Sequence, residues 1–326
     1  MTSTTRTPAT APFAALVAHA QNDVRLQELT VDDLAQDGDV LVEVTHSSLN
    51  YKDALAITGK GRIARKFPLI LGIDLAGTVV ETGERVVGVG QGLGESDGGG
   101  YTRFQRVKRD ALVPLPAGMS AEQAMQLGTA GFTAMLAVMA LDHAGVTPGK
   151  EVVVTGAAGG VGSIAVMLLA KEGHHVVAVT GRPELEPYLK GLGATTVIAR
   201  EELTKKSGPL QSERWGGGID TVGGEMLANL YAQTAYEGAI ACCGMAASHE
   251  LATTVWPLIL RNVSLLGISS IRTSMDKRVT AWNRLAGRVD FGTLAELSTS
   301  VPLTGLRAVA EELLAGRVRG RTVVEM

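Results

Sequence analysis

The fold is decided by the stretch Val152-Val153-Val154-Thr155-Gly156-Ala157-Ala158-Gly159-Gly160-Val161-Gly162. It joins a β-branched run to a glycine turn and then to an apolar helical run. Glycines let the backbone turn tightly, and their missing side chains let a pyrophosphate approach the free N–H groups of the helix N-terminus. The spacing is G-x-x-G-x-x-G instead of the commoner G-x-G-x-x-G. We expect Gly159, Gly160, Val161 and Gly162 to contact a dinucleotide; the alternative is a tight turn that binds nothing.

The residues around this turn predict a doubly wound α/β fold with a parallel sheet. Short β-branched runs alternate with helical runs in the order strand, helix, strand, helix, strand, which is the pattern of βαβ units. The predicted strands are 151–155, 175–180 and 196–199, the helices are 161–172 and 184–192, and the later strands are 219–222, 239–243 and 264–268.

The first third of the chain predicts a different architecture. Short strands at 13–19, 40–46, 75–81 and 85–89 are separated by Gly, Asp and Asn, which suggests a partly closed barrel. Helical runs follow at 121–127 and 132–144. A helix near 306–315 and a strand at 322–325 come after the parallel sheet is complete. We therefore expect the C-terminal segment to return to the β-rich domain.

Composition excludes several classes of function. The 326 residues are 45% hydrophobic and 19% charged, and a net charge of −3 leaves no basic patch for nucleic acid. The apolar stretches are expected to stop well short of the roughly 20 residues of a membrane span. The two cysteines, Cys242 and Cys243, are adjacent, so no disulfide framework is expected. Low cysteine usage favours the cytoplasm.

The second predicted strand of the sheet indicates which dinucleotide binds. An NAD site commonly has Asp or Glu at this strand end to bond the ribose 2′-OH, whereas this strand runs into Thr180-Gly181-Arg182. Thr180 can donate a hydrogen bond, and Arg182 offers a planar fork that suits a phosphate. Arg200, at the end of the next strand, adds a second positive group. These residues favour NADPH; the alternative is that both arginines are solvated loop residues.

Several stretches resemble one family. The chain is similar to the medium-chain dehydrogenase/reductase superfamily, and within it to the quinone-oxidoreductase-like branch that contains the acryloyl-CoA reductases. The resemblance rests on the segments 47–59, 67–77, 128–135 and 320–322. Asn50-Tyr51-Lys52-Asp53, within the first of them, and the separate Thr180-Gly181-Arg182 make it specific. It implies a GroES-like domain at 1–124 and 271–326 and a Rossmann NADPH-binding domain at 125–270.

The resemblance also implies a reaction. Zinc enzymes of the superfamily have metal ligands where this chain has Asn50 and Ile73, so no metal is expected here. Without zinc to polarise a carbonyl, NADPH would reduce the C=C bond of acryloyl-CoA to give propanoyl-CoA. The candidate catalytic residues are Tyr51, which packs on the nicotinamide of the cofactor or donates a proton or hydrogen bond, Asn50 as a donor to the substrate carbonyl, and Asp53 as an orienting group. Simpler interpretations are that Tyr51 is a packing wall and that Asn50 caps a turn.

The remaining expectations concern the cofactor cleft and partners. By resemblance, Thr129 lies near the nicotinamide, while Met245, Ile259 and Ser270 line the cleft. An acyl-CoA substrate and a homodimer are implied in the same way. A basic run, Lys52, Lys60, Arg62, Arg65 and Lys66, is expected to be a solvated loop, with contact to CoA phosphates as the alternative.

Two other functions compete with this prediction. An NADPH:quinone reductase would share the fold, the cofactor and the lack of zinc. A non-catalytic relative would retain the fold but is expected to have lost the glycine turn or the Asn-Tyr-Lys-Asp motif. Both motifs are intact here, which favours an enzyme.

Overall fold

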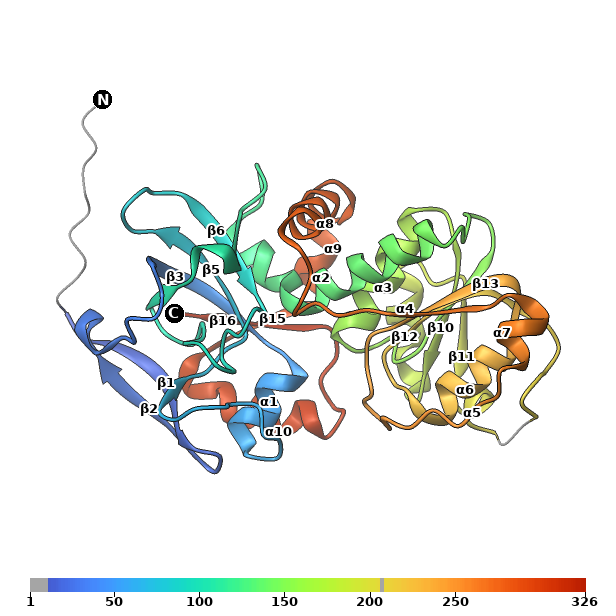
Figure 1. Ribbon diagram of the computed structural model, residues 1–326, viewed down its shortest axis with the longest axis horizontal. Helices are drawn as coiled ribbons and strands as arrows, with labels where there is room; N and C mark the ends of the chain where they lie inside the picture. The colour runs from blue at the N-terminus through green and yellow to red at the C-terminus, as the bar shows by residue number, and fades with distance from the viewer. Residues whose placement is uncertain (1–10, 206–207) are drawn as a thin grey trace. The chain divides into compact units, whose positions relative to one another are not determined.

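The computed structural model describes residues 11–205 and 208–326, and the chain divides into two compact units (Figure 1). The first unit holds the residues up to Thr129 together with Ser270–Ala286 and Asp290–Met326. The second holds Ala130–Ser269 and Gly287–Val289. The sequence-based division put residues 125–129 in the second unit. They group with the first unit, where the backbone N–H of Thr129 donates to the Asp74 carboxylate.

The second unit is built on a six-stranded parallel sheet with the order β11-β10-β9-β12-β13-β14. The predicted doubly wound sheet is therefore confirmed. The strand order reverses between β9 and β12, and ligands of such sheets bind at this switch point, beyond the carboxyl ends of the strands. The strands are β9 (Glu151–Val154), β10 (His175–Thr180), β11 (Thr196–Ala199), β12 (Trp215–Asp220), β13 (Thr234–Cys242) and β14 (Ser264–Gly267).

Strand β12 begins earlier than the predicted 219 because three glycines extend it. A Cβ at Gly217 would lie 2.9 Å from the Ala239 carbonyl oxygen, and one at Gly218 would lie 2.9 Å from the Leu230 side chain. The glycines thus let a neighbouring strand and a helix approach the backbone closely.

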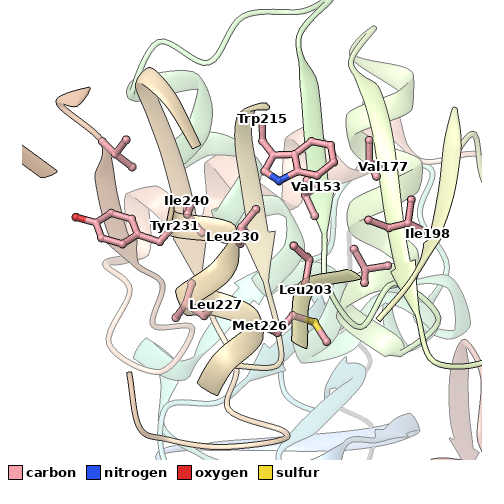
Figure 2. Packing of buried hydrophobic residues seen from close by; sticks show 12 residues of the cluster. Val153, Val177, Ile198, Leu203, Trp215, Met226, Leu227, Leu230, Tyr231 and Ile240 are labelled. Carbon is pink, nitrogen blue, oxygen red and sulfur yellow. The ribbon is translucent and has the colours of Figure 1, made fainter. Parts of the chain in front are cut away.

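Helices cover this sheet and enclose its core, which Figure 2 shows from close by. Val153, Val177, Leu230 and Ile240 gather with Trp215, and none of these side chains is more than 1% exposed. Burial of each aliphatic side chain stabilises the unit by about 1.5–3 kcal/mol. The helices are α3 (Gly160–Lys171), α4 (Glu186–Gly191), α5 (Glu201–Thr204), α6 (Gly224–Gln233) and α7 (Trp256–Arg261).

The first unit contains a seven-stranded mixed sheet with the order β15-β16-β3-β5-β6-β8, and β7 also pairs with β3. The C-terminal strand returns as predicted, since Thr322 of β16 pairs with Leu49 of β3. The strands are β3 (Val40–Leu49), β5 (Asp74–Val79), β6 (Arg85–Val89), β7 (Phe104–Val107), β8 (Leu112–Pro114), β15 (Ser298–Pro302) and β16 (Arg321–Glu325).

A smaller sheet and two packed helices complete this unit. The sheet has the order β2-β1-β4, with β1 at Phe13–Ala20, β2 at Asp23–Leu29 and β4 at Leu69–Ile70. Helices α1 (Tyr51–Thr58) and α10 (Leu306–Leu314) lie side by side and share one buried apolar cluster (Figure 1). Helix α1 and helices α8 (Met275–Arg288) and α9 (Phe291–Glu296) were not predicted.

Helix α2 (Ala121–His143) corresponds to the two predicted helical runs, because Gly128 has the non-helical angles φ 52° and ψ −155° between them. Among the described residues it is the one helix that is long and apolar enough to cross a membrane. The expectation that every apolar stretch stops well short of a span is therefore wrong for this segment. In its most apolar window, 83% is buried inside the protein, as in a core helix.

Candidate active site

The glycine turn follows β9 and depends on close backbone packing. Gly156 has φ 59°, and a Cβ there would lie 2.3 Å from the Thr221 hydroxyl oxygen. A Cβ at Gly162 would lie 2.2 Å from the Gly156 carbonyl oxygen, so only glycine lets α3 start this close to the turn. Gly159 is the N-cap of α3 and supplies no capping side chain. The first N–H groups of the helix, at Gly160, Val161 and Gly162, are therefore available to an anion.

The end of β10 carries a positively charged corner. Thr180 is buried, and its hydroxyl oxygen accepts a hydrogen bond from the Arg182 N–H at 3.1 Å. A Cβ at Gly181 would lie 2.4 Å from Nε of Arg200, so the Arg200 side chain lies directly over this glycine. Glu201 lies 3.5 Å from Arg200, but both side chains are well exposed, so the pairing is weak. The structure thus brings Thr180, Gly181, Arg182 and Arg200 together.

A buried aspartate links the carboxyl ends of β9 and β12, and sequence reasoning missed it. Asp220 accepts a hydrogen bond from the Thr155 hydroxyl at 2.7 Å and another from the Gly223 N–H at 2.8 Å. Burial raises the pKa of Asp220. Burial likewise raises the pKa of Cys242 and of Cys243 to about 12, so neither is a thiolate at neutral pH. An aspartate at the end of a glycine-rich apolar strand was the available signal.

The structure separates two residues that were expected to line one cleft. The Cα of Met245 lies 3.4 Å from the Cβ position of Gly223, at the carboxyl edge of the sheet. Ile259 lies on α7 and is 71% exposed. Its neighbour Arg261 donates to the carbonyl of Thr234, the first residue of β13, so α7 ends at the opposite edge. Met245 therefore lies with the glycine turn, and Ile259 does not.

In the first unit, the Asn-Tyr-Lys-Asp motif begins helix α1. Asn50 is the N-cap, and its N–H donates to the Asp53 carboxylate at 3.0 Å. Tyr51, the first helical residue, is 49% exposed and presents its side chain to solvent. Lys52 pairs with Glu95 at 2.8 Å. Asp53 is buried and accepts from the Ile73 N–H at 2.9 Å, so it orients neither Lys52 nor Tyr51 directly.

A second buried carboxylate, Asp74 of β5, joins this helix start to more distant segments. It accepts hydrogen bonds from the Asn50 side-chain amide at 2.8 Å and from the Ser48 hydroxyl at 2.5 Å. Thr129 donates to Asp74 through its N–H at 2.8 Å and through its hydroxyl. Sequence reasoning did not single out Asp74; the signal was a charged residue inside the apolar run 69–77.

The Asn50 amide is committed to this network. Its nitrogen lies within 3.2 Å of three acceptors, on Ser48, Asp53 and Asp74. An amide nitrogen has two hydrogens, so none remains for a substrate carbonyl in this arrangement. The geometry fits a capping and positioning role for Asn50 better than the expected role as a substrate donor.

Arg321 of β16 supplies the positive charge beside the two carboxylates. It is buried and donates to the Gln126 carbonyl and to the Ser48 hydroxyl, each at 3.0 Å. Burial lowers the pKa of Arg321, while Asp74 and Asp53 oppose that shift. Tyr101 closes the group by donating to the Ser48 carbonyl at 3.1 Å, and burial raises the pKa of its phenol.

Only glycine fits at position 128 beside this network. Its φ of 52° already disfavours a side chain. A Cβ there would lie 2.5 Å from the Ser48 hydroxyl oxygen and 2.6 Å from an Asp74 carboxylate oxygen. The kink of α2 at Gly128 thereby places Thr129 against Asp74.

Ser270, which was expected to line the cofactor cleft, is held through its backbone by the side chain of Arg278. Its carbonyl accepts from the buried guanidinium of Arg278 at 2.7 Å, and the Val89 carbonyl accepts from the same group at 2.8 Å. Burial lowers the pKa of Arg278 to about 10. The structure thus fixes Ser270 through its backbone.

Two family models match the chain. A GroES-like alcohol dehydrogenase domain matches residues 36–117, and a zinc-binding dehydrogenase domain matches residues 160–286. The probable acrylyl-CoA reductase AcuI of Escherichia coli K12 is 49% identical over 298 residues, which cover 89% of this chain and 92% of that protein.

The chain belongs to the medium-chain dehydrogenase/reductase superfamily. Another member, the putative quinone oxidoreductase YhfP of Bacillus subtilis, is 42% identical and covers 96% of this chain and 99% of its own length. Among solved structures of the superfamily, the yhdH oxidoreductase of Salmonella enterica in complex with NADP has a TM-score of 0.93 at 47% identity. The structural alignment covers 96% of this chain and 99% of the Salmonella enterica chain. The Bacillus subtilis yhfP structure with NAD bound has the same TM-score at 41% identity, and covers 97% of this chain and 100% of that one.

The buried Asp53 makes a prediction about pH. Burial, and then the neighbouring charge of Asp74, raise the pKa of Asp53 to about 7 from an ordinary value near 3.8. The folded protein therefore holds a proton that the unfolded chain releases, so this group lowers stability as pH rises from about 4 to about 7. We expect the free energy of unfolding to fall less steeply over that range in Asp53→Asn than in the native protein. Urea unfolding at several pH values measures it, and identical slopes for the two proteins would contradict the assignment.

Proposed function

We propose that this protein reduces the C=C bond of acryloyl-CoA to give propanoyl-CoA, with NADPH as the hydride donor and without a metal. The observation that carries the proposal is 49% identity to an acrylyl-CoA reductase over nearly the whole chain, with the glycine turn and the Asn-Tyr-Lys-Asp motif intact. The Salmonella enterica oxidoreductase, which was solved in complex with NADP, supports the choice of cofactor.

The residues present fit this cofactor. The glycine turn leaves no side chain between an incoming pyrophosphate and the N-terminus of α3. At the end of β10, Arg200 and Arg182 flank Gly181 where an NAD site would carry an acid. We propose that Gly159, Gly160, Val161 and Gly162 hold the pyrophosphate, and that Thr180, Arg182 and Arg200 hold the 2′-phosphate. Thr129, Met245 and Ser270 remain proposed cleft residues; the placement of Ile259 argues against it.

Within the first unit, Tyr51 is the proposed catalytic residue. NADPH, when bound, supplies hydride to the β-carbon of the thioester. The resulting enolate needs a proton at its α-carbon and a hydrogen bond at its oxygen. The exposed phenol of Tyr51 is able to donate to either atom. Asn50 and Asp53 are proposed to hold Tyr51 at the first position of α1 through the capping contact between them.

The proposed reaction uses no metal. Asn50 and Ile73 stand where zinc enzymes of the superfamily have ligands, and Ile73 has no donor atom. In residues 11–205 and 208–326, no group of three or more His, Cys, Asp or Glu side chains is placed to hold a metal ion. Hydride addition to an activated C=C bond needs a polarised thioester, which protein hydrogen bonds can supply.

The rival activity is reduction of a quinone by NADPH, and the putative quinone oxidoreductase of Bacillus subtilis favours it. We expect rapid oxidation of NADPH with acryloyl-CoA, in buffer containing EDTA, and much slower oxidation with NADH or with a simple quinone. The loss of NADPH absorbance measures each rate. Turnover of the quinone without turnover of the thioester would establish the rival, and equal rates with NADH would contradict the role given to Arg182 and Arg200.

The role of Tyr51 is tested by two substitutions. If its phenol donates a proton or hydrogen bond, Tyr51→Phe should lower kcat by about a hundredfold, because general acid catalysis commonly contributes that much. The affinity for NADPH should change little. If Tyr51 is a packing wall, Tyr51→Phe keeps the native kcat and Tyr51→Ala loses it. Steady-state kinetics of the two variants separates these outcomes.

We also propose a cytoplasmic homodimer formed through the second unit. Strand β14 is an edge of the parallel sheet, and α7, which precedes it in the chain and packs against β13, exposes Trp256, Leu258, Ile259 and Leu260. An uncovered edge strand next to exposed apolar side chains is a common interface between identical subunits. Cys242 and Cys243 are unpaired, which suits a reducing compartment.

The assembly is tested by solution mass. Light scattering after size exclusion should give twice the mass of one chain, and the Ile259→Glu/Leu260→Glu variant should give the mass of a single chain, because it buries charge in the interface. Tyr236→Glu, another exposed apolar position in the second unit, is the control and should remain dimeric. A native protein with the mass of one chain would refute the proposal.

A further inference from the structure

The first unit contains a cavity whose walls include none of the residues proposed to bind NADPH or to act in catalysis. Its volume is about 330 Å³, within the range of small-molecule sites. Its walls come from the end of β1, from α1 and from the loop that follows α1. The buried Ala18 and Ala56 make a floor of small side chains, and the exposed Arg62, Arg65 and Phe67 line the cavity toward solvent.

The side chains around the cavity suit a nucleotide, which combines an aromatic base with phosphate groups on its sugar. The ring of Phe67 is 42% exposed and offers a flat apolar face for stacking. Arg62 and Arg65 present guanidinium groups that match phosphate oxygens. Small alanines in the floor leave the room that a planar ring needs. Stacking of a base on an aromatic ring, together with basic side chains that contact phosphate, is a recurring way for proteins to bind nucleotides.

The local charge is positive after ion pairs are taken into account. Lys52 lies 2.8 Å and Arg65 lies 3.7 Å from the same carboxylate, Glu95, so one negative charge serves two cations. Among the residues that the structure describes, Lys60 and Arg62 have no acidic partner within 4.0 Å. Lys66, by contrast, pairs with Asp37 at 2.8 Å and does not line the cavity.

The cavity lies close enough to Tyr51 to serve the same substrate. Ala56 and Tyr51 are on one helix, and five residues of helix span roughly 8 Å. Lys52, next to Tyr51, reaches the cavity rim through the shared carboxylate of Glu95. The pantetheine of coenzyme A is a flexible arm that is long enough to join an acyl group beside Tyr51 to a nucleotide in this cavity.

We propose that this cavity binds the phosphorylated adenosine end of the coenzyme A thioester. The adenine stacks on Phe67, and the phosphates contact Arg62 and Arg65. The inference rests on the proposed function for the identity of the thioester, and it assigns to the cavity the selection of a CoA ester over a simple enone. The substrate thus bridges the start of α1 and the loop after it.

The test compares acryloyl-CoA with a short thioester that keeps the cysteamine end and lacks both the nucleotide and the rest of the pantetheine arm. Acryloyl-CoA and acryloyl-N-acetylcysteamine are reduced by the native protein, by Arg62→Ala/Arg65→Ala, and by the control Lys66→Ala, which removes a cation outside the cavity. We expect the ratio of kcat/KM for acryloyl-CoA to that for the short thioester to fall at least tenfold in the double variant, through KM. In Lys66→Ala the ratio should equal the native one.

An unchanged ratio in the double variant would overturn the proposal, and so would a parallel loss with both thioesters, which signals a structural defect. A second double variant, Arg62→Lys/Arg65→Lys, should recover part of the ratio, because lysine restores the charge without the planar fork.

A binding measurement separates this proposal from the proposed function. Calorimetry with adenosine 3′,5′-bisphosphate, added to protein saturated with NADP⁺ so that the proposed dinucleotide site is filled, should show binding to the native protein and at least tenfold weaker binding to Arg62→Ala/Arg65→Ala. If the native protein reduces neither thioester, the proposed function fails. The titration still tests whether the cavity binds a nucleotide. No binding to the native protein, or equal binding to both proteins, refutes the cavity assignment.

Discussion

The first unit depends on a buried carboxylate, Asp74, whose charge must be satisfied away from water. An unpaired charge in such a place would cost several kcal/mol, so each oxygen has to receive hydrogen bonds. Ser48, Asn50 and Thr129 provide them, and Arg321 adds positive charge nearby. These donors come from the end of β3, the start of α1 and the kink of α2, and Arg321 of the last strand joins the group through the Ser48 hydroxyl.

The same constraint explains the local shape of the proposed catalytic helix. With its amide held by Asp74 and its N–H held by Asp53, Asn50 fixes where α1 begins. The next residue, Tyr51, is then directed outward from a rigid position. The network therefore offers pre-organisation, in which packing and buried hydrogen bonds hold a reactive side chain in place.

In the second unit the corresponding constraint is close backbone approach. Gly156 and Gly162 leave no room for a Cβ, and this closeness brings the start of α3 to the carboxyl edge of the sheet.

Much of the fold could be read from local patterns. The strands 175–180 and 196–199 and the helix after the glycine turn were predicted nearly to the residue, because apolar runs bounded by glycine are strong local signals. Strand β2 was missed because it is a largely exposed edge strand without an alternating apolar pattern. Helix α8 was missed because one of its buried residues is Arg278, and a sequence pattern assigns an arginine to the solvent-facing side of a helix.

The sequence by itself determined the dinucleotide fold, the residues at the end of β10 that favour NADPH, and the motif that starts α1. Only the tertiary structure decided what those residues contact. Asp74 and Arg321 are far apart in the chain and carry no periodic signal, so their convergence depends on the pairing of β16 with β3 and of β3 with β5. The commitment of the Asn50 amide and the distance of Ile259 from the glycine turn have the same origin. Hydrogen bonds between remote segments form only after the sheets have assembled, and no local window of sequence records them.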